Sequence, residues 1–256
     1  MRLPVSGFEV RFRVPDGNDD LAILETAGNV VERALAVLPR LALFAADARW
    51  EALTVTDFEF GLLELRRFLL GDRVSCDFRC ARCGERMEVE FSIQAFLSDI
   101  EPKMPCGVRL NEARPGWYLL DGSLETSFRL IEVRDQEKVL GQRDAAHLLT
   151  QLCIEPHDGN ARSLAHRLAR VVRSMEAMAP AVSRPVAGVC AACDAPVTMP
   201  LHVPRLVMDE LRMAASGVHQ QTHAIAEAYH WDEASILAMP QARRQAYVEM
   251  IRQVAV

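Results

Sequence analysis

Two short cysteine motifs carry the clearest chemistry in this sequence. "CARC" occupies residues 80–83 and "CAAC" occupies residues 190–193. A C-x-x-C spacing lets two thiolates bind one metal ion, and a structural zinc site takes four ligands in a tetrahedron. Each motif therefore supplies two of the four ligands. Loss of the metal should unfold most of the protein. The expected ligands of one structural Zn²⁺ are Cys80, Cys83, Cys190 and Cys193.

Other interpretations of the cysteines stay open at this stage. A redox C-x-x-C pair usually lies at a helix N-terminus, where the thiol pKa is lowered, whereas alternating strand patterns follow both pairs here. Cys76 lies shortly before the first motif and is an alternative ligand. The pairs could also be retained for packing without any metal. We expect Cys106 and Cys153 to be small buried apolar residues.

Three histidines suggest a second metal site. His219 and His223 are four residues apart on an expected helix, and His230 follows. Zinc proteases use H-E-x-x-H, in which the glutamate is the general base. This chain reads "HQQTH", so Gln220 stands where that base would be. The pattern favours surface histidines over a metalloenzyme, and the expectation is that the chain is not an enzyme.

Nucleic-acid binding is the main alternative function, because zinc ribbons often bind DNA or RNA. Arg79, Arg82 and Arg86 flank the first motif, but the second motif has almost no basic neighbours. The chain has a formal net charge of −6, whereas neutralising phosphates needs clustered Lys and Arg. Nucleic acid is therefore an unlikely partner.

We expect the elements that position the cysteines to be duplicated along the chain. Residues 9–24 and 125–140 align without gaps at five identical positions, including Arg13 with Arg129 and Asp19 with Asp135. Apolar residues alternate after each cysteine motif, which predicts a half-buried strand there. The same order of segments at similar spacing indicates an internal duplication.

In each half, the residues between the first strand and the cysteine motif have helical patterns. The clearest is expected from Thr56, acting as the N-cap with Glu59 as its capping-box partner, to Gly71. The sequence thus predicts an α+β fold of two pseudo-repeats, each running strand, helices, zinc knuckle and strand. A split four-cysteine zinc ribbon joins them, and a helical tail follows. The expected boundaries are 1–97, 98–203 and 204–256.

Composition and cysteine usage indicate the kind of cellular compartment. Hydrophobic residues make up 50% of the 256 residues, the range of an ordinary globular protein. The longest apolar stretch is interrupted by Pro39 and Arg40, so no membrane span is expected. The N-terminus has no apolar signal segment, and seven cysteines is an odd number. A reducing compartment, with cysteines that bind metal, is therefore expected.

The tail carries a motif made of His223, Ala226, Tyr229, Trp231, Ile236, Leu237, Pro240, Arg243, Arg244 and Tyr247. This motif resembles one in small proteins of contractile phage tails and of related extracellular contractile injection systems. Over most of its length the chain is similar to baseplate-associated proteins of those systems, including the hub-assembly proteins of T-even phages. Met239 and Asp194 depart from the family pattern, which has Leu and Gly at these positions.

The resemblance implies a structural or assembly role at a baseplate, without catalysis. Hub, spike or other baseplate proteins would then be the partners. The protein would be in the bacterial cytoplasm during assembly, and either stay in the finished baseplate or leave as an assembly chaperone. The candidate partner-contact residues are His223, Tyr229, Trp231, Arg243, Arg244 and Tyr247.

Overall fold

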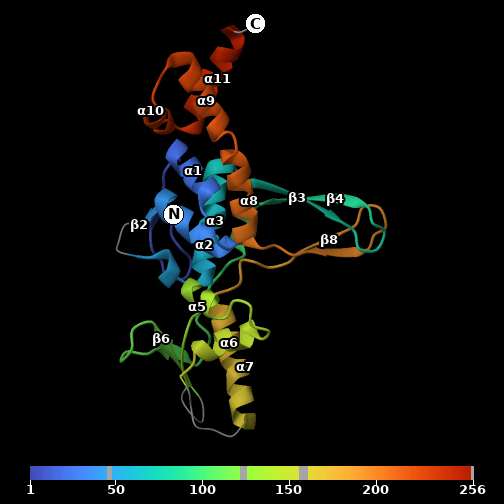
Figure 1. Ribbon diagram of the computed structural model, residues 1–256. Helices are drawn as coiled ribbons and strands as arrows, with labels where there is room; N and C mark the ends of the chain where they lie inside the picture. The colour runs from blue at the N-terminus through green and yellow to red at the C-terminus, as the bar shows by residue number, and fades with distance from the viewer. Residues whose placement is uncertain (45–47, 122–125, 156–160, 255–256) are drawn as a thin grey trace.

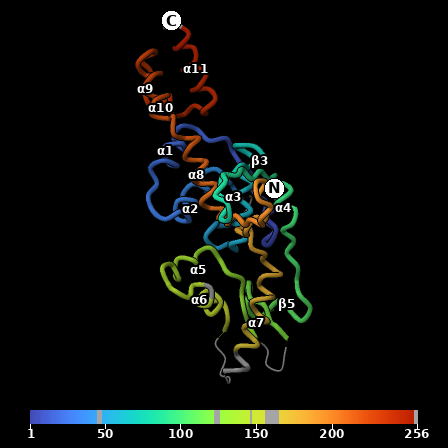
Figure 2. Tube along the Cα trace, turned by 90° about the vertical axis from the view of Figure 1, so that its right-hand side faces the viewer, coloured from blue at the N-terminus to red at the C-terminus, as the bar shows by residue number. Residues whose placement is uncertain are grey.

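The computed structural model describes residues 1–44, 48–121, 126–155 and 161–254 of the chain. The molecule is elongated, with three groups of elements along its long axis and an arm of two β-hairpins that projects from the middle group (Figure 1). Figure 2, turned by 90°, shows the same order of the three groups. The fold is mixed α+β with small antiparallel sheets, which confirms the expected class. No helix in these ranges is both long and apolar enough to cross a membrane.

The middle group contains the largest apolar core. Phe58, Leu62 and Leu65 recur on one face of a long helix and are fully buried. Trp50 packs against Gly61, where an added Cβ would lie 2.6 Å from the indole ring, so only glycine fits. The elements are β1 (Val10–Phe12), α1 (Gly17–Glu25), α2 (Val30–Leu41), β2 (Ala42–Phe44), η1 (Trp50–Ala52), α3 (Val55–Leu70) and α4 (Ile93–Ser98).

Helix α3 begins earlier than the sequence pattern predicts. Thr54, not Thr56, is the N-cap, because its hydroxyl accepts a hydrogen bond from the Asp57 amide at 3.2 Å. Thr56 instead donates to the Pro180 carbonyl at 3.0 Å. Glu59 is likewise not a capping residue, since its carboxylate binds a residue much later in the chain. The first turn of α3 is thus a junction between distant segments.

Helix α8 (Val203–Ala215) completes the middle core from the other end of the sequence. Val203, Val207 and Met208 are fully buried against helices α1, α2 and α3. Figure 1 shows α8 lying alongside these helices. The segment from residue 204 therefore does not start a separate tail: its first helix belongs to the core built by the N-terminal residues.

The lower group is a smaller unit with its own core around Phe128, Val171 and Cys153. Its three strands form one antiparallel sheet in the order β5–β6–β7. Helix α7 packs against β7 and leads back toward the middle group, while α5 lies at the junction with that group (Figure 1). The elements are β5 (Val108–Leu110), β6 (Trp117–Leu120), β7 (Thr126–Arg129), α5 (Val133–Lys138), α6 (Ala145–Leu152) and α7 (Ala161–Met178).

An arginine–aspartate fork occurs at the same place in the middle and lower groups. Arg13 donates both terminal nitrogens to Asp19 at 2.6 and 2.7 Å. Arg129 does the same to Asp135 at 2.6 and 2.8 Å. In each case the aspartate also accepts the amide of the N-cap residue three positions earlier, at 3.0 Å. Each fork therefore fixes the turn between a strand and the helix that follows it.

The Asp135 fork predicts a loss of stability in acid. Burial raises the pKa of Asp135, but hydrogen bonds from Arg129 and the Glu132 amide outweigh it, and the pKa falls from 3.8 to about 2. A depressed carboxyl pKa contributes stability above the ordinary value and loses it as pH falls toward the folded-state value. The contribution is about 2 kcal/mol. In urea unfolding, the difference in free energy of unfolding between the parent and Asp135→Asn should shrink by that amount from about pH 6 to pH 2.

The matched control for this experiment is the exposed Asp209→Asn on α8. Its free energy of unfolding should track that of the parent at every pH. A gap between parent and Asp135→Asn that stays constant with pH would contradict the assigned role of the fork.

The C-terminal group is a small helical unit at the opposite end of the long axis (Figure 1). Its separate core consists of Ile225, Ile236, Met239 and Val248. Asp232 caps the short middle helix by accepting the Ser235 amide at 2.9 Å. The elements are α9 (Val218–Tyr229), α10 (Glu233–Leu237) and α11 (Gln241–Val254).

Candidate metal centre

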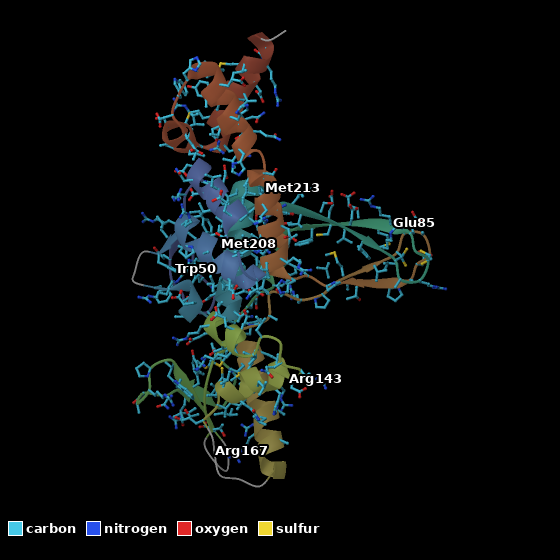
Figure 3. All side chains as sticks on the ribbon, in the orientation of Figure 1. Trp50, Glu85, Arg143, Arg167, Met208 and Met213 are labelled. Atoms are coloured by element: carbon cyan, nitrogen blue, oxygen red, sulfur yellow. The ribbon has the colours of Figure 1, made fainter. Side chains whose placement is uncertain are left out.

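The two cysteine motifs lie at the tips of two β-hairpins. In the first, β3 (Arg73–Arg79) pairs antiparallel with β4 (Arg86–Ser92). In the second, β8 (Val186–Val189) pairs with β9 (Pro196–Met199). The hairpins run outward together and form the arm in Figure 1. Glu85, which follows the first motif, lies at the far end of the arm (Figure 3).

The two hairpin turns have the same backbone geometry. The Cys80 amide donates to the Glu85 carbonyl and the Gly84 amide to the Cys80 carbonyl, both at 2.9 Å. The corresponding bonds of Cys190, to Ala195 and from Asp194, are also 2.9 Å. Gly84 and Asp194 both have a left-handed backbone, with φ of +75° and +54°. Asp194 thus replaces glycine without changing the turn, because aspartate tolerates this conformation.

The four sulfurs converge on one point. All four lie within 4.8 Å of one another. The Sγ atoms of Cys80 and Cys193 are 3.8 Å apart, and those of Cys83 and Cys190 are 3.7 Å apart. A tetrahedron with metal–sulfur bonds of about 2.3 Å has edges of about 3.8 Å, whereas a disulfide would need about 2.05 Å. The predicted convergence of the four cysteines is confirmed, and their spacing suits one tetrahedral ion.

The electrostatics of the cluster also favour a bound cation. Backbone amides of Cys83 and Arg82 point at the Cys80 sulfur and lower its pKa to about 6. The Glu85 amide lowers the pKa of Cys83, but burial and the neighbouring sulfurs raise it by more, to about 12. Cys80 therefore loses its proton readily, whereas deprotonation of Cys83 is opposed. A divalent cation removes this opposition, because it compensates several thiolates at once.

Little apolar packing holds the tip of the arm together. Phe78, Met87, Ala195 and Val197 surround the sulfurs as a small cluster distinct from the three helical cores. A two-stranded hairpin is marginally stable on its own. A metal bound there would be the main cross-link between the hairpins. We therefore expect its loss to disorder the arm while the body stays folded, which is a narrower effect than the loss of most of the fold expected from the sequence.

The alternative roles for the cysteines find little support. Cys76 lies on β3 opposite Val89, outside the four-sulfur group, and burial raises the pKa of its thiol. Both motifs occupy hairpin turns, not helix N-termini where a redox pair would be activated. Cys153 is fully buried, as expected, but Cys106 is exposed, so the prediction of a buried Cys106 is wrong.

The three histidines do not form a metal site. His219, His223 and His230 are all exposed. Within the described ranges, the four cysteines are the cluster of three or more potential ligands that the fold brings together. His223 faces Glu227 on its own helix at 3.6 Å. The metalloenzyme interpretation therefore has no geometric basis.

Four of the six candidate partner-contact residues lie together on the C-terminal group. The rings of Tyr229 and Trp231 stack at 5.2 Å, and Tyr247 meets both edge-on. The Arg243 guanidinium lies 5.9 Å from the centre of the Tyr247 ring. Tyr229 and Trp231 are 38% and 39% exposed. We call Tyr229, Trp231, Arg243 and Tyr247 the aromatic patch.

Arg244 is a correction to that set of six. Its side chain is fully buried, with an exposed fraction of 0%. It donates to the Gln221 side chain at 3.1 Å, to the Met239 carbonyl and to the carboxylate of Asp20 on α1. The residue therefore joins the C-terminal group to the middle group and is not available to a partner.

A buried junction between the middle and lower groups was not foreseen from the sequence. Ser183 donates its amide and its hydroxyl to the two carboxylate oxygens of Glu59, at 2.8 and 2.7 Å. No local pattern could reveal a contact between residues 124 positions apart. The only available signal was an acidic residue on the buried face of an amphipathic helix.

Comparison with known proteins adds nothing to this geometry. No protein-family model matches the chain, and no curated protein or solved structure matches it either.

Proposed function

We propose that the ion is zinc and that it clips the two hairpins into one arm. The four thiolates, their tetrahedral spacing and the two matching turns all support this. Four thiolates in a tetrahedron also suit iron, so metal analysis must distinguish the two. A metal with four protein ligands has no open position for substrate or water. The site therefore suits a structural role better than a catalytic one.

We also propose that the chain arose by duplication of a strand–helices–knuckle–strand unit. The paired arginine–aspartate forks and the paired knuckle turns support this, because each recurs in the same order in both halves. The ranges 1–97, 98–203 and 204–256 describe these units in the sequence. Helix α8 is the exception in space, since it packs back onto the first unit.

We infer that the protein is a non-catalytic structural or assembly component of the baseplate of a contractile phage tail or injection system. The scaffold role is supported by the convergence of four sulfurs from hairpins more than a hundred residues apart. The placement at a baseplate is supported by the resemblance of the tail motif. The aromatic patch supports partner binding, because partly exposed Tyr and Trp next to Arg is the composition typical of interface hot spots.

The partners in this proposal are hub, spike or other baseplate proteins, met in the bacterial cytoplasm during assembly. Particle composition tests whether the protein stays in the baseplate or acts as a chaperone. Purified particles would contain stoichiometric amounts in the first case, and only assembly intermediates would contain it in the second.

Substituting Trp231 tests the partner role. Trp231→Ala removes one of the three mutually contacting rings of the aromatic patch, and a hot-spot residue typically contributes at least about 2 kcal/mol to binding. We expect pull-down of co-expressed hub or spike protein to fall at least about tenfold. Met213→Ala is the control, since Met213 on α8 is 74% exposed and lies outside the patch (Figure 3). Equal retention by Trp231→Ala and the parent would exclude the patch as the contact.

The alternative is a zinc-ribbon protein that binds nucleic acid or regulates it. Arg79, Arg82 and Arg86 are exposed at the tip of the arm, as this function would need. The ion pair of Arg86 with Asp77 at 2.6 Å and the net charge of −6 weaken the case. Salt-sensitive binding of DNA or RNA that is lost with the three arginines would favour the alternative.

A further inference from the structure

A cavity of about 480 Å³ lies where the middle and lower groups meet. The first turn of α3, the α5–α6 segment and the last turns of α7 line it. This volume is within the range of small-molecule sites in proteins, about 300–1,000 Å³. Helices α5, α6 and α7, which contribute to its lining, lie apart from the arm whose tip carries the metal centre (Figure 1).

The walls of the cavity are mostly apolar, with an acidic bias. Leu149, Val172 and Met175 contribute hydrocarbon surface, while Glu59 and Glu176 supply the acidic groups. Among the described lining residues there is no Lys or Arg. His202 is the remaining titratable group on the wall. Its Nδ1 accepts the Arg205 amide at 3.3 Å.

Glu59 is the unusual feature of the wall. The residue is only 6% exposed, and both its carboxylate oxygens accept hydrogen bonds from Ser183. The Ser183 hydroxyl also accepts the Val203 amide at 3.0 Å, so its own proton is directed to Glu59. Both oxygens therefore act as acceptors, as those of a carboxylate do. Burial raises the pKa of Glu59, and among the described residues no cationic side chain contributes to offsetting that cost.

We propose that this cavity binds a small organic cation with an apolar body and an ammonium or guanidinium head. The apolar body packs against the hydrocarbon wall, and the cationic head pairs with Glu59. Glu176, exposed on α7, adds to the attraction. A volume of about 480 Å³ accommodates a body of several carbon atoms beside the head. The proposal does not depend on the zinc site or on a role at a baseplate.

The competing explanation is that Glu59 only ties α3 to the segment around Ser183. Both explanations predict that removing the carboxylate alters the junction. They differ in charge selectivity, because a purely structural tie gives the cavity no preference for a cation.

Titration of the full-length protein with three hexyl probes separates the two. The probes are n-hexylammonium, n-hexanol and hexanoate, with binding followed through the NMR signal of the Ser183 amide at constant ionic strength. We expect n-hexylammonium to bind at least about tenfold more tightly than hexanoate and several-fold more tightly than n-hexanol, as a buried charge pair implies. Equal affinity for the three probes would overturn the proposal, and this comparison needs no variant.

The variant Glu59→Gln keeps the shape of the side chain and one acceptor for Ser183. It should lose most of the preference for n-hexylammonium over n-hexanol and keep only what the exposed Glu176 contributes, while the control Glu227→Gln, exposed on α9, keeps the full preference of the parent. Retention of the full ammonium preference by a folded Glu59→Gln would assign the selectivity elsewhere and contradict the proposal.

Discussion

Replacing Cys190 by serine will abolish stoichiometric metal binding and disorder the arm, while the helical body keeps its fold. Cys190 is fully buried at the tip and supplies one of the four converging sulfurs. A structural zinc contributes on the order of 10 kcal/mol to folding where its site is intact. Without it, the outer part of the hairpins retains only the small apolar cluster around Val197, and hairpins of two strands are marginally stable.

Amide hydrogen exchange is the measurement that distinguishes local from global loss. In Cys190→Ser, protection should vanish in the outer part of the arm, residues 77–88 and 187–197, but persist at the bases of the hairpins, which pack on the middle core, and in α3 and α8. Cys106→Ser is the control, because Cys106 is exposed and outside the cluster. The account of the arm would fail if the variant kept the metal and the protection of both hairpins.

Replacing Arg244 by methionine will destabilise the protein by about 3–5 kcal/mol, the cost of breaking a buried ion pair. The substitution leaves the Asp20 carboxylate buried without a counter-charge and the Met239 carbonyl without its donor. Burial raises the pKa of Asp20, which stays above its ordinary value even though Arg244 lowers it. Asp20 is therefore poorly tolerated as an anion unless the arginine is present.

Chemical denaturation of Arg244→Met beside Arg243→Met provides a matched comparison of neighbouring arginines. Arg243 is exposed, so its variant should stay within about 0.5 kcal/mol of the parent. The double variant with Asp20→Asn should lose less than the sum of the two single variants, because the residues form one pair. Additive losses would show that Arg244 acts without Asp20.

The metal centre was predictable from the sequence because its determinants are local. Each C-x-x-C motif forms its turn from consecutive residues, and the alternating residues after it specify the strand. One motif supplies two ligands and a structural site needs four, so the convergence of Cys80 and Cys83 with Cys190 and Cys193 follows from ligand number alone. The alignment of Arg13 with Arg129 and of Asp19 with Asp135 likewise marked the residues that form the two equivalent forks.

The residues that the sequence did not place correctly are defined by long-range contacts. Arg243 and Arg244 are adjacent, and successive helical residues point in different directions, but the sequence does not reveal which direction meets Asp20. Glu59 has the spacing of a capping-box residue, yet its carboxylate binds Ser183. Helix α8 is amphipathic like any surface helix, so its pattern cannot specify which core it covers.

Metal analysis combined with X-ray absorption on the full-length protein, purified without chelator, tests the central claim most directly. The account predicts one zinc ion per chain with four sulfur neighbours at about 2.3 Å. Protein that is folded at the arm but contains no stoichiometric metal, or whose metal has nitrogen or oxygen ligands in place of the four sulfurs, would contradict it.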